Sequence, residues 1–261
     1  VGAFGCFQSL ASEAVRKLGR RVQEDRFHVA AITYADDVDM IFDFNDHIDN
    51  RDKIISTLKT IPYPSYGSSE SQSNLHLALQ KVRVELMTET HGYIDTSRPI
   101  VLVVLSDGEV RSNPSSNPEA CAEISDANEC GAKLLAVELA HPIYSSMITL
   151  RWVFRTKNGP VLHPDVEQFR VDQLGLIASE SDVYASGLAQ RDACDTAAIS
   201  DFVNFMLSSE LVRQCDTTQT STVTTTAVTC RIADLVFVFD LSSSVGDSNC
   251  DSVAIKKLCP G

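Results

Sequence analysis

A carboxylate and several hydroxyls stand close together near the C-terminal end of the chain, in the segment Asp240-Leu-Ser-Ser-Ser244. The apolar run from Leu235 to Phe239 comes directly before them, and its short, β-branched and aromatic composition predicts a buried strand. The oxygens of Asp240, Ser242 and Ser244 would then lie at the carboxyl end of that strand. Oxygen ligands of this kind suit Mg²⁺ or Mn²⁺ rather than zinc.

Strands and helices alternate along the rest of the chain, as hydrophobic periodicity predicts them. The expected helices cover residues 7–20, 50–60, 73–87, 118–129, 171–179 and 197–212. The expected strands cover 27–35, 38–44, 100–105, 133–139 and 182–185. Runs that are apolar throughout, such as Ile100 to Leu105, call for a parallel sheet covered by helices on both faces. Residues 141–170 break the alternation, and we expect an inserted hairpin there, formed by 148–154 and 161–163.

Composition limits the classes of partner. The formal net charge of −13 argues against a nucleic-acid backbone and fits attraction for cations or basic surfaces, although it equally serves solubility. The apolar runs are about as long as strands, so this segment predicts no membrane span. The 44% hydrophobic content allows a sizeable core.

The eight cysteines show no Cys-x-x-Cys spacing and no accompanying His cluster, which disfavours a zinc site. Scattered cysteines in an acidic chain favour disulfides and an oxidising compartment, and buried free thiols are the alternative. Cys121 lies in the helix predicted at 118–129, and Cys130 directly follows it. Nine residues of helix would hold them about 13 Å apart, beyond disulfide geometry unless the helix breaks.

The C-terminal part repeats a feature of the N-terminus. Val1-Gly2 is followed by Cys6, and Val245-Gly246 is followed by Cys250 at the same spacing. The Thr- and Ser-rich residues 215–230 lie before the second occurrence and cannot build a core, which is typical of a linker. The simplest interpretation is a tandem array, with the chain running from one copy into the next.

Three motifs together resemble the von Willebrand factor A (vWA) domain and its metal-ion-dependent adhesion site. They are Asp240-Leu-Ser-Ser-Ser244, Ser73-Asn-Leu75 before an Ala-Leu helix, and Ser106-Asp-Gly-Glu109. The resemblance covers nearly the whole chain and implies an α/β, Rossmann-like, doubly wound sheet of strand order 3-2-1-4-5-6. Ligands of such sheets bind at the carboxyl ends of the strands where the order reverses, between strands 1 and 4.

The resemblance also implies roles for these residues. Ser242, Ser244 and Ser73 would bind the metal directly, whereas Asp240 and Asp107 would act mostly through waters or as charge balance. An ion with few carboxylate ligands stays electrophilic, so a carboxylate of a partner protein can complete its coordination. Ser73 stands where the family usually has Thr, with Ser68, Ser69 and Ser71 as neighbouring alternatives. Ser243 stands where Gly is common.

Residues 1–214 contain every family element except strand 1, which is central in the sheet. We therefore expect a vWA-like domain at 1–214, a linker at 215–230, and strand 1 with the start of helix 1 of a following copy at 231–261. Either a preceding copy supplies the missing strand, or residues 234–241 fold back between the strands at 27–35 and 100–106. In the second case residues 245–261 compete with 1–20 for one helix position. By analogy with relatives, Cys215–Cys230 is a plausible disulfide.

The function that follows is an extracellular module, secreted or on a cell surface, that binds an acidic residue of a protein ligand through Mg²⁺. The alternative is a structural element of a matrix or filament-like vWA array, in which neighbouring copies are the partners and no metal-dependent binding occurs. An enzyme is not expected. His76 and His91 could be paired with Asp107 as acid–base groups, but the sequence offers no nucleophile–base pair or phosphate loop.

Overall fold

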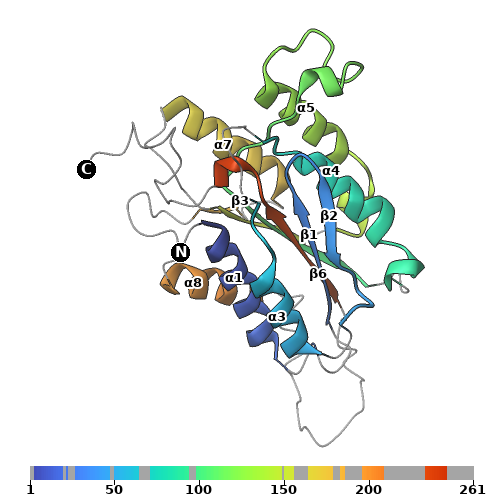
Figure 1. Cartoon of the computed structure of the whole chain (residues 1–261), viewed down its shortest axis with the longest axis vertical. Coiled ribbons are helices and arrows are strands. Elements are labelled where there is room, and N and C mark those ends of the chain that lie inside the picture. The colour runs from blue at the N-terminus through green and yellow to red at the C-terminus, as the bar shows by residue number, and fades with distance from the viewer. Residues whose placement is uncertain are drawn as a thin grey trace, which may run out of the picture.

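A six-stranded sheet forms the centre of the molecule, with the order β2-β1-β6-β3-β4-β5 in the computed structural model (Figure 1). The strands are β1 (Phe27–Tyr34), β2 (Val38–Phe42), β3 (Ile100–Ser106), β4 (Leu150–Arg155), β5 (Val183–Ala185) and β6 (Ala233–Asp240). Only β2 runs antiparallel to its neighbour. The structure describes residues 3–19, 22, 27–47, 50–64, 71–93, 98–148, 150–155, 164–178, 183–185, 196–208 and 233–245.

Helices cover both faces of the sheet. On one face lie α1 (Ala3–Leu18), α3 (Arg51–Thr60) and α8 (Thr196–Ser208), and on the other α4 (Leu75–Lys81), α5 (Ala127–Leu139) and α7 (Pro164–Ile177) (Figure 1). Each face has its own apolar core. The expected doubly wound, Rossmann-like α/β class is confirmed. Among the described residues, no helix combines the length and apolar character needed to cross a membrane.

Strand β6 fills the central position although it lies far along the chain from its neighbours. It pairs in parallel with β1, where Tyr34 is opposite Asp240, and with β3, where Leu105 is opposite Phe239. All eight residues of β6 are buried. The fold-back of this segment between the strands at 27–35 and 100–106 is therefore confirmed. In the numbering of the family, β2, β1, β6, β3, β4 and β5 are strands 3, 2, 1, 4, 5 and 6, which is the expected order.

Helix α1 occupies the helix position beside this strand and buries Phe4, Phe7 and Leu10 against the core. Residues 246–261, which were expected to compete with α1 for this position, and the linker at 215–230 lie outside the described residues. The assignment of 231–261 to a following copy stays a prediction.

The prediction of a strand at 133–139 is wrong. These residues belong to α5, and residues 118–123 form turns instead of the helix expected at 118–129. The side chain of Asp126 accepts hydrogen bonds from the main-chain N–H groups of Asn128 and Glu129, which fixes the start of the helix. Leu135 faces the core from α5, while the Ala- and Leu-rich sequence around it favours helix.

The hairpin expected within residues 141–170 is also wrong. Leu150–Arg155 is a sheet strand that pairs in parallel with β3 and β5, between the short helix α6 (Ile143–Ser146) and α7. Trp152 and Phe154 enter one core and Val153 the other, so this strand is covered on both faces. The 161–163 half of the hairpin lies outside the described residues, and α7 begins earlier than the helix expected at 171–179.

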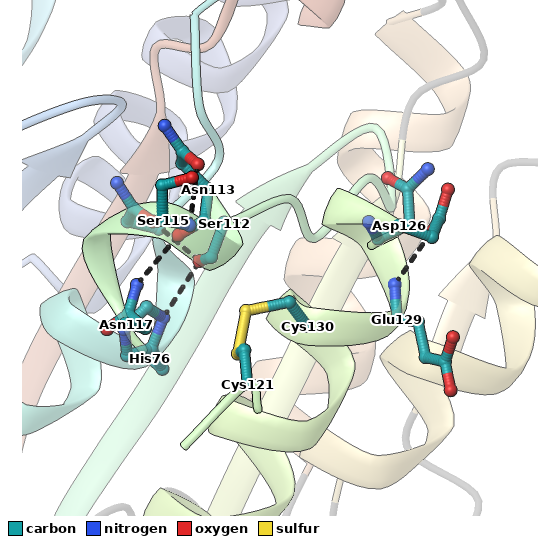
Figure 2. The surroundings of a disulfide bond; sticks show 11 residues. His76, Ser112, Asn113, Ser115, Asn117, Cys121, Asp126, Glu129 and Cys130 are labelled. Carbon is teal, nitrogen blue, oxygen red and sulfur yellow. Dashed lines mark hydrogen bonds between the residues drawn. A yellow bond between two sulfur atoms is a disulfide. The ribbon is translucent and has the colours of Figure 1, made fainter. Parts of the chain in front are cut away.

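Cys121 and Cys130 form a disulfide with a Cα–Cα distance of 5.5 Å, contrary to the separation expected for one continuous helix (Figure 2). The reason is that α5 begins only at Ala127, so the turns before it bring Cys121 back to the first part of the helix. Cys6 is disulfide-bonded too. None of the described cysteines is a free thiol, and the suggested pair Cys215–Cys230 falls outside the described part of the chain.

Candidate metal centre

Four of the five expected metal-site residues come together at the carboxyl ends of β6 and β3, the central strands of the sheet. Asp240 ends β6 and is fully buried, and Asp107 directly follows β3 and is also buried. Ser73 comes from the loop before α4, and its Oγ lies 3.4 Å from Oδ2 of Asp240. Ser242 follows Asp240 by two residues and is buried. The sheet topology thus joins residues that lie more than a hundred positions apart in the sequence.

Hydrogen bonds fix the orientation of the Asp240 carboxylate. Ser106 Oγ donates to Oδ2 at 2.7 Å, and the main-chain N–H of Ser242 donates to Oδ1 at 2.9 Å. The Ser73 hydroxyl donates its proton to the main-chain oxygen of Glu109 at 2.7 Å. Its oxygen lone pairs consequently stay available to a cation, since a hydroxyl has one proton to give and two lone pairs to offer.

The loop after β3 holds Asp107 in a tight turn. The N–H of Glu109 donates to Oδ1 of Asp107 at 3.0 Å, and the N–H of Gly108 donates to Ser106 Oγ at 3.0 Å. Gly108 has φ 96°, a conformation that a residue with a Cβ adopts only with strain. The buried Arg155 at the end of β4 donates from Nε to the main-chain oxygen of Asp107 at 2.9 Å. The turn is therefore anchored from a neighbouring strand.

A two-sided backbone bridge fixes Ser73. Its N–H donates to the oxygen of Arg111 at 2.8 Å, and the N–H of Arg111 donates back at 3.2 Å. Next to this bridge, Ser112 Oγ donates to Asn74 Oδ1 at 2.6 Å. The same oxygen lies 3.4 Å from Nδ1 of His76 (Figure 2). The loop of Asp107 and the loop of Ser73 therefore form one hydrogen-bonded unit.

The loop that carries Ser242 is attached to the same unit. The N–H of Ser71 donates to Ser243 Oγ at 3.0 Å, and the N–H of Ser243 donates to Ser71 Oγ at 2.6 Å. Tyr63 OH donates to the main-chain oxygen of Ser242 at 2.9 Å. Ser244 lies in the short 3₁₀ turn Ser243–Val245, and the direction of its side chain is outside what the structure describes. Of the three alternatives to Ser73, Ser68 and Ser69 are outside it as well, and the hydroxyl oxygen of Ser71 accepts the N–H of Ser243.

The electrostatics of the site disfavour negative charge on Asp240. Burial, and next the nearby Asp107, raise the pKa of Asp240 to about 7. Burial also raises the pKa of Tyr34 well above its usual value, and the charge of Asp240 adds to this. Two buried carboxylates near each other are costly in the ionised form, and a divalent cation held at this site would offset that cost.

The donor set fits a hard cation. Hydroxyl oxygens of serine and the carboxylate oxygens of Asp240 and Asp107 converge here, and these are ligands of hard cations and not of zinc. The part of the chain that the structure describes holds no cluster of three or more His, Cys, Asp or Glu residues that could bind a metal ion, so any ion here would depend on the serines. Both Asp240 oxygens already accept hydrogen bonds, which fits a role as charge balance behind the serines.

Sequence reasoning missed several residues of this site. Ser106 belongs to the motif Ser106-Asp-Gly-Glu109, but no part in metal binding was expected for it. It is the last residue of β3 and therefore lies at the edge of the sheet where the site forms. Tyr34 and Arg155 likewise end strands that lie beside the central pair. Their position as last strand residues was the available signal. The pairing of Ser71 with Ser243 had no signal in the sequence.

Comparison with known proteins supports the fold. A family model described as von Willebrand factor type A domain matches residues 4–144, which is over half of the chain. A search of curated proteins found no match.

Proposed function

The chain belongs to the von Willebrand factor type A family, and we propose that it is an extracellular protein-binding module that engages an acidic ligand residue through Mg²⁺ or Mn²⁺. Ser73, Ser242 and Ser244 would hold the ion directly, with Asp240 and Asp107 balancing its charge. When bound, the ion would supply an electrophilic coordination position for a carboxylate of the partner. The family itself suggests a protein partner, and the metal dependence is the part that is proposed.

The observation that carries this proposal is the buried Asp240 carboxylate, which lies beside Asp107 and accepts the Ser106 hydroxyl. A fold seldom retains an ionisable side chain in such a place without a compensating charge. Ser106 and the N–H of Ser242 orient Asp240, and Glu109 N–H orients Asp107. The chain would thereby hold its serine oxygens in place before any ion arrives.

The disulfides support an oxidising compartment. Cys121 and Cys130 are bonded to each other, and Cys6 is disulfide-bonded as well. Such bonds persist mainly in secreted and cell-surface proteins. The negative net charge of −13 fits a domain that attracts cations and avoids nucleic acid.

We propose no catalytic role for the site. Ser112 lies near His76, but Ser112 is fully buried and donates its proton to Asn74. Burial also lowers the pKa of His76 to about 4. A nucleophile must be reachable by its substrate and must share its proton with the base, and this serine does neither.

The structural-array function remains the second candidate, because of the repeated Val-Gly and Cys spacing at 1–6 and 245–250. The two functions differ in their dependence on the ion. An array element would self-associate equally well in Mg²⁺ and in chelator, whereas an adhesion module would lose its ligand in chelator.

The test is to titrate Mg²⁺ into the full chain and to measure the heat of binding by calorimetry. The same titration is made with the variants Asp240→Ala and Asp107→Ala. Asp52→Ala is the matched control, since Asp52 is exposed on α3 and pairs only with the neighbouring Arg51 among the described residues. The proposal expects saturable binding in the unaltered protein and in the control, and its loss in both site variants. Equal heats in all four proteins would refute it.

A further inference from the structure

A buried ion pair lies at the opposite end of β6 from the candidate metal centre. Arg98 Nε donates to Oδ1 of Asp234 at 3.0 Å, and Nη2 lies 2.7 Å from the same oxygen. Asp234 is fully buried and Arg98 nearly so. His28 of β1, the register partner of Asp234, approaches the same carboxylate at 3.6 Å. The pair joins the central strand to the segment that leads into β3.

The apolar residues of β6 define its register only weakly. Leu235, Phe237 and Phe239 face one core, and Val236 and Val238 face the other. A slip by one residue would exchange the two faces and is excluded. A slip by two residues keeps every side chain on its face and restores the ladder of a parallel pair. In one direction it puts Val236 in the place of Val238, Phe237 in that of Phe239 and Leu235 in that of Phe237. Hydrophobic burial therefore separates these registers less sharply than it excludes the one-residue slip.

The polar residues at the two ends of the strand do separate them. Asp234 and Asp240 are an even number of positions apart, so they lie on the same face of β6. A slip by two residues moves each carboxylate by about 6.6 Å. That movement separates Asp234 from Arg98, and it also takes Asp240 away from Ser106 and Ser73. The position of one carboxylate consequently fixes that of the other.

The ion pair is a costly way to join two strands. Burial raises the pKa of Asp234 although Arg98 and His28 both act to lower it. Its Oδ2 accepts no hydrogen bond from any described residue. Buried ion pairs of this kind often add little stability compared with apolar residues, and their best-supported use is to select one register.

We propose that Arg98 and Asp234 are positioning residues, which select the register of β6 that places Asp240 beside Ser73 and Ser106. Two further contacts hold the Arg98 end of this arrangement. Tyr93 OH donates to the main-chain oxygen of Arg98 at 3.0 Å, and the N–H of Asp234 donates to the oxygen of Pro99 at 3.0 Å. The inference rests on the proposed function only where metal affinity is its readout.

The test replaces the pair by apolar residues in the full chain, as R98M/D234L. The matched control is R83M/E138L, which removes a salt bridge with an Arg83 Nε–Glu138 Oε1 distance of 2.7 Å that involves α5 and not β6. Register is read from backbone NOEs recorded without metal. In the native register Ala31 is opposite Phe237.

The expected result is a folded R98M/D234L protein that shows a second set of β6 resonances, with Ala31 opposite Leu235 or Phe239. Its apparent Mg²⁺ affinity should fall in proportion to the fraction of molecules left in the native register. The control should keep one register and the affinity of the unaltered protein.

Either of two results would overturn the proposal. One is a folded double variant that keeps a single native register. The other is a double variant that does not fold, because the pair would then serve stability instead of selection. If the unaltered protein binds no Mg²⁺, the proposed function fails, but the NOE comparison still decides the role of the pair.

Discussion

Ser71 and Ser243 lie 172 positions apart in the sequence and exchange two hydrogen bonds, each from a main-chain N–H to the other residue's hydroxyl oxygen. This exchange joins the loop before α4 to the loop after β6. It also gives a physical reason for a serine at position 243, where the family resemblance leads one to expect glycine. The hydroxyl supplies the contact that holds the loop against its neighbour.

The first prediction concerns this exchange. Ser243→Ala removes one acceptor and leaves the N–H of Ser71 without that bond, which should cost about 1 kcal/mol of loop stability. We expect Mg²⁺ binding to weaken by roughly fivefold in calorimetry. Ser145→Ala is the control, because among the described residues that hydroxyl bonds locally, to the oxygen of Pro142. Equal affinities in the two variants would show that the loops are held by other contacts.

A second prediction follows from the hydrogen bond of Ser106 to Asp240. This bond lowers the pKa of Asp240, opposing the effects of burial and of Asp107. In Ser106→Ala the pKa should move above its value of about 7 in the unaltered protein. The pH midpoint of Mg²⁺ binding, measured by titration at a series of pH values, should therefore move upward. A midpoint that stays in place or moves downward would contradict the assigned role.

The third prediction is a pH dependence of stability without metal. The pKa of Asp240 in the folded state, about 7, lies above the ordinary value for Asp, so ionisation of this group opposes folding. The stability that protonated Asp240 contributes to the folded state is fully present below the pKa of an ordinary Asp. It is lost as the pH rises through the folded-state pKa of about 7. Mg²⁺ should offset this loss.

The measurement is the rise in Tm on adding Mg²⁺ at two pH values. The rise should be large at about pH 8 and small at about pH 5.5, because the protonated carboxyl no longer attracts the ion. Asp240→Asn should show little rise at either pH. A rise that is independent of pH in the unaltered protein would indicate an ion bound elsewhere.

The fourth prediction concerns the disulfide between Cys121 and Cys130, which are separated by 9 positions. Replacing both cysteines by serine should lower the free energy of unfolding by about 2.5 kcal/mol, on the chain-entropy account of a short loop. Denaturant unfolding measures this. We also expect weaker Mg²⁺ binding, because α5 packs against the loop that follows Asp107.

That packing is close. A Cβ added to Gly131 would come within 2.7 Å of the main-chain oxygen of Val110, and the N–H of Ser112 donates to the oxygen of Ala127 at 3.0 Å. Gly131→Ala should therefore weaken Mg²⁺ binding with the disulfide intact. If neither change affects affinity, α5 does not support the site.

The sequence was sufficient to predict the class of fold. The apolar run that ends in Asp240 suits the one gap in the family order, but the sequence left open whether residues 234–241 or a preceding copy fills that gap. The region from 118 to 155 was predicted poorly. The segment at 133–139 has apolar residues that suit either a strand or a helix, and only the Asp126 cap and the packing of Leu135 decide for the helix. A strand was expected at 148–154, but as half of a hairpin. Arg151 within it gave no sign that this strand is covered on both faces of the sheet.

The candidate site also has a part that the sequence predicts and a part that it does not. Asp240, Ser73 and Asp107 could be found because each follows or precedes a recognisable element. The contacts between Ser71 and Ser243 depend on loops that meet only in the folded molecule. No local pattern of residues encodes such a meeting.

The most direct test of the metal centre is paramagnetic broadening by Mn²⁺ in amide spectra of the full chain. We predict that substoichiometric Mn²⁺ first broadens the amides near Ser73, Asp107 and Ser242, and that excess Mg²⁺ restores them. Broadening that begins at exposed acidic residues elsewhere, such as Asp52, and spares these three loops would contradict the account.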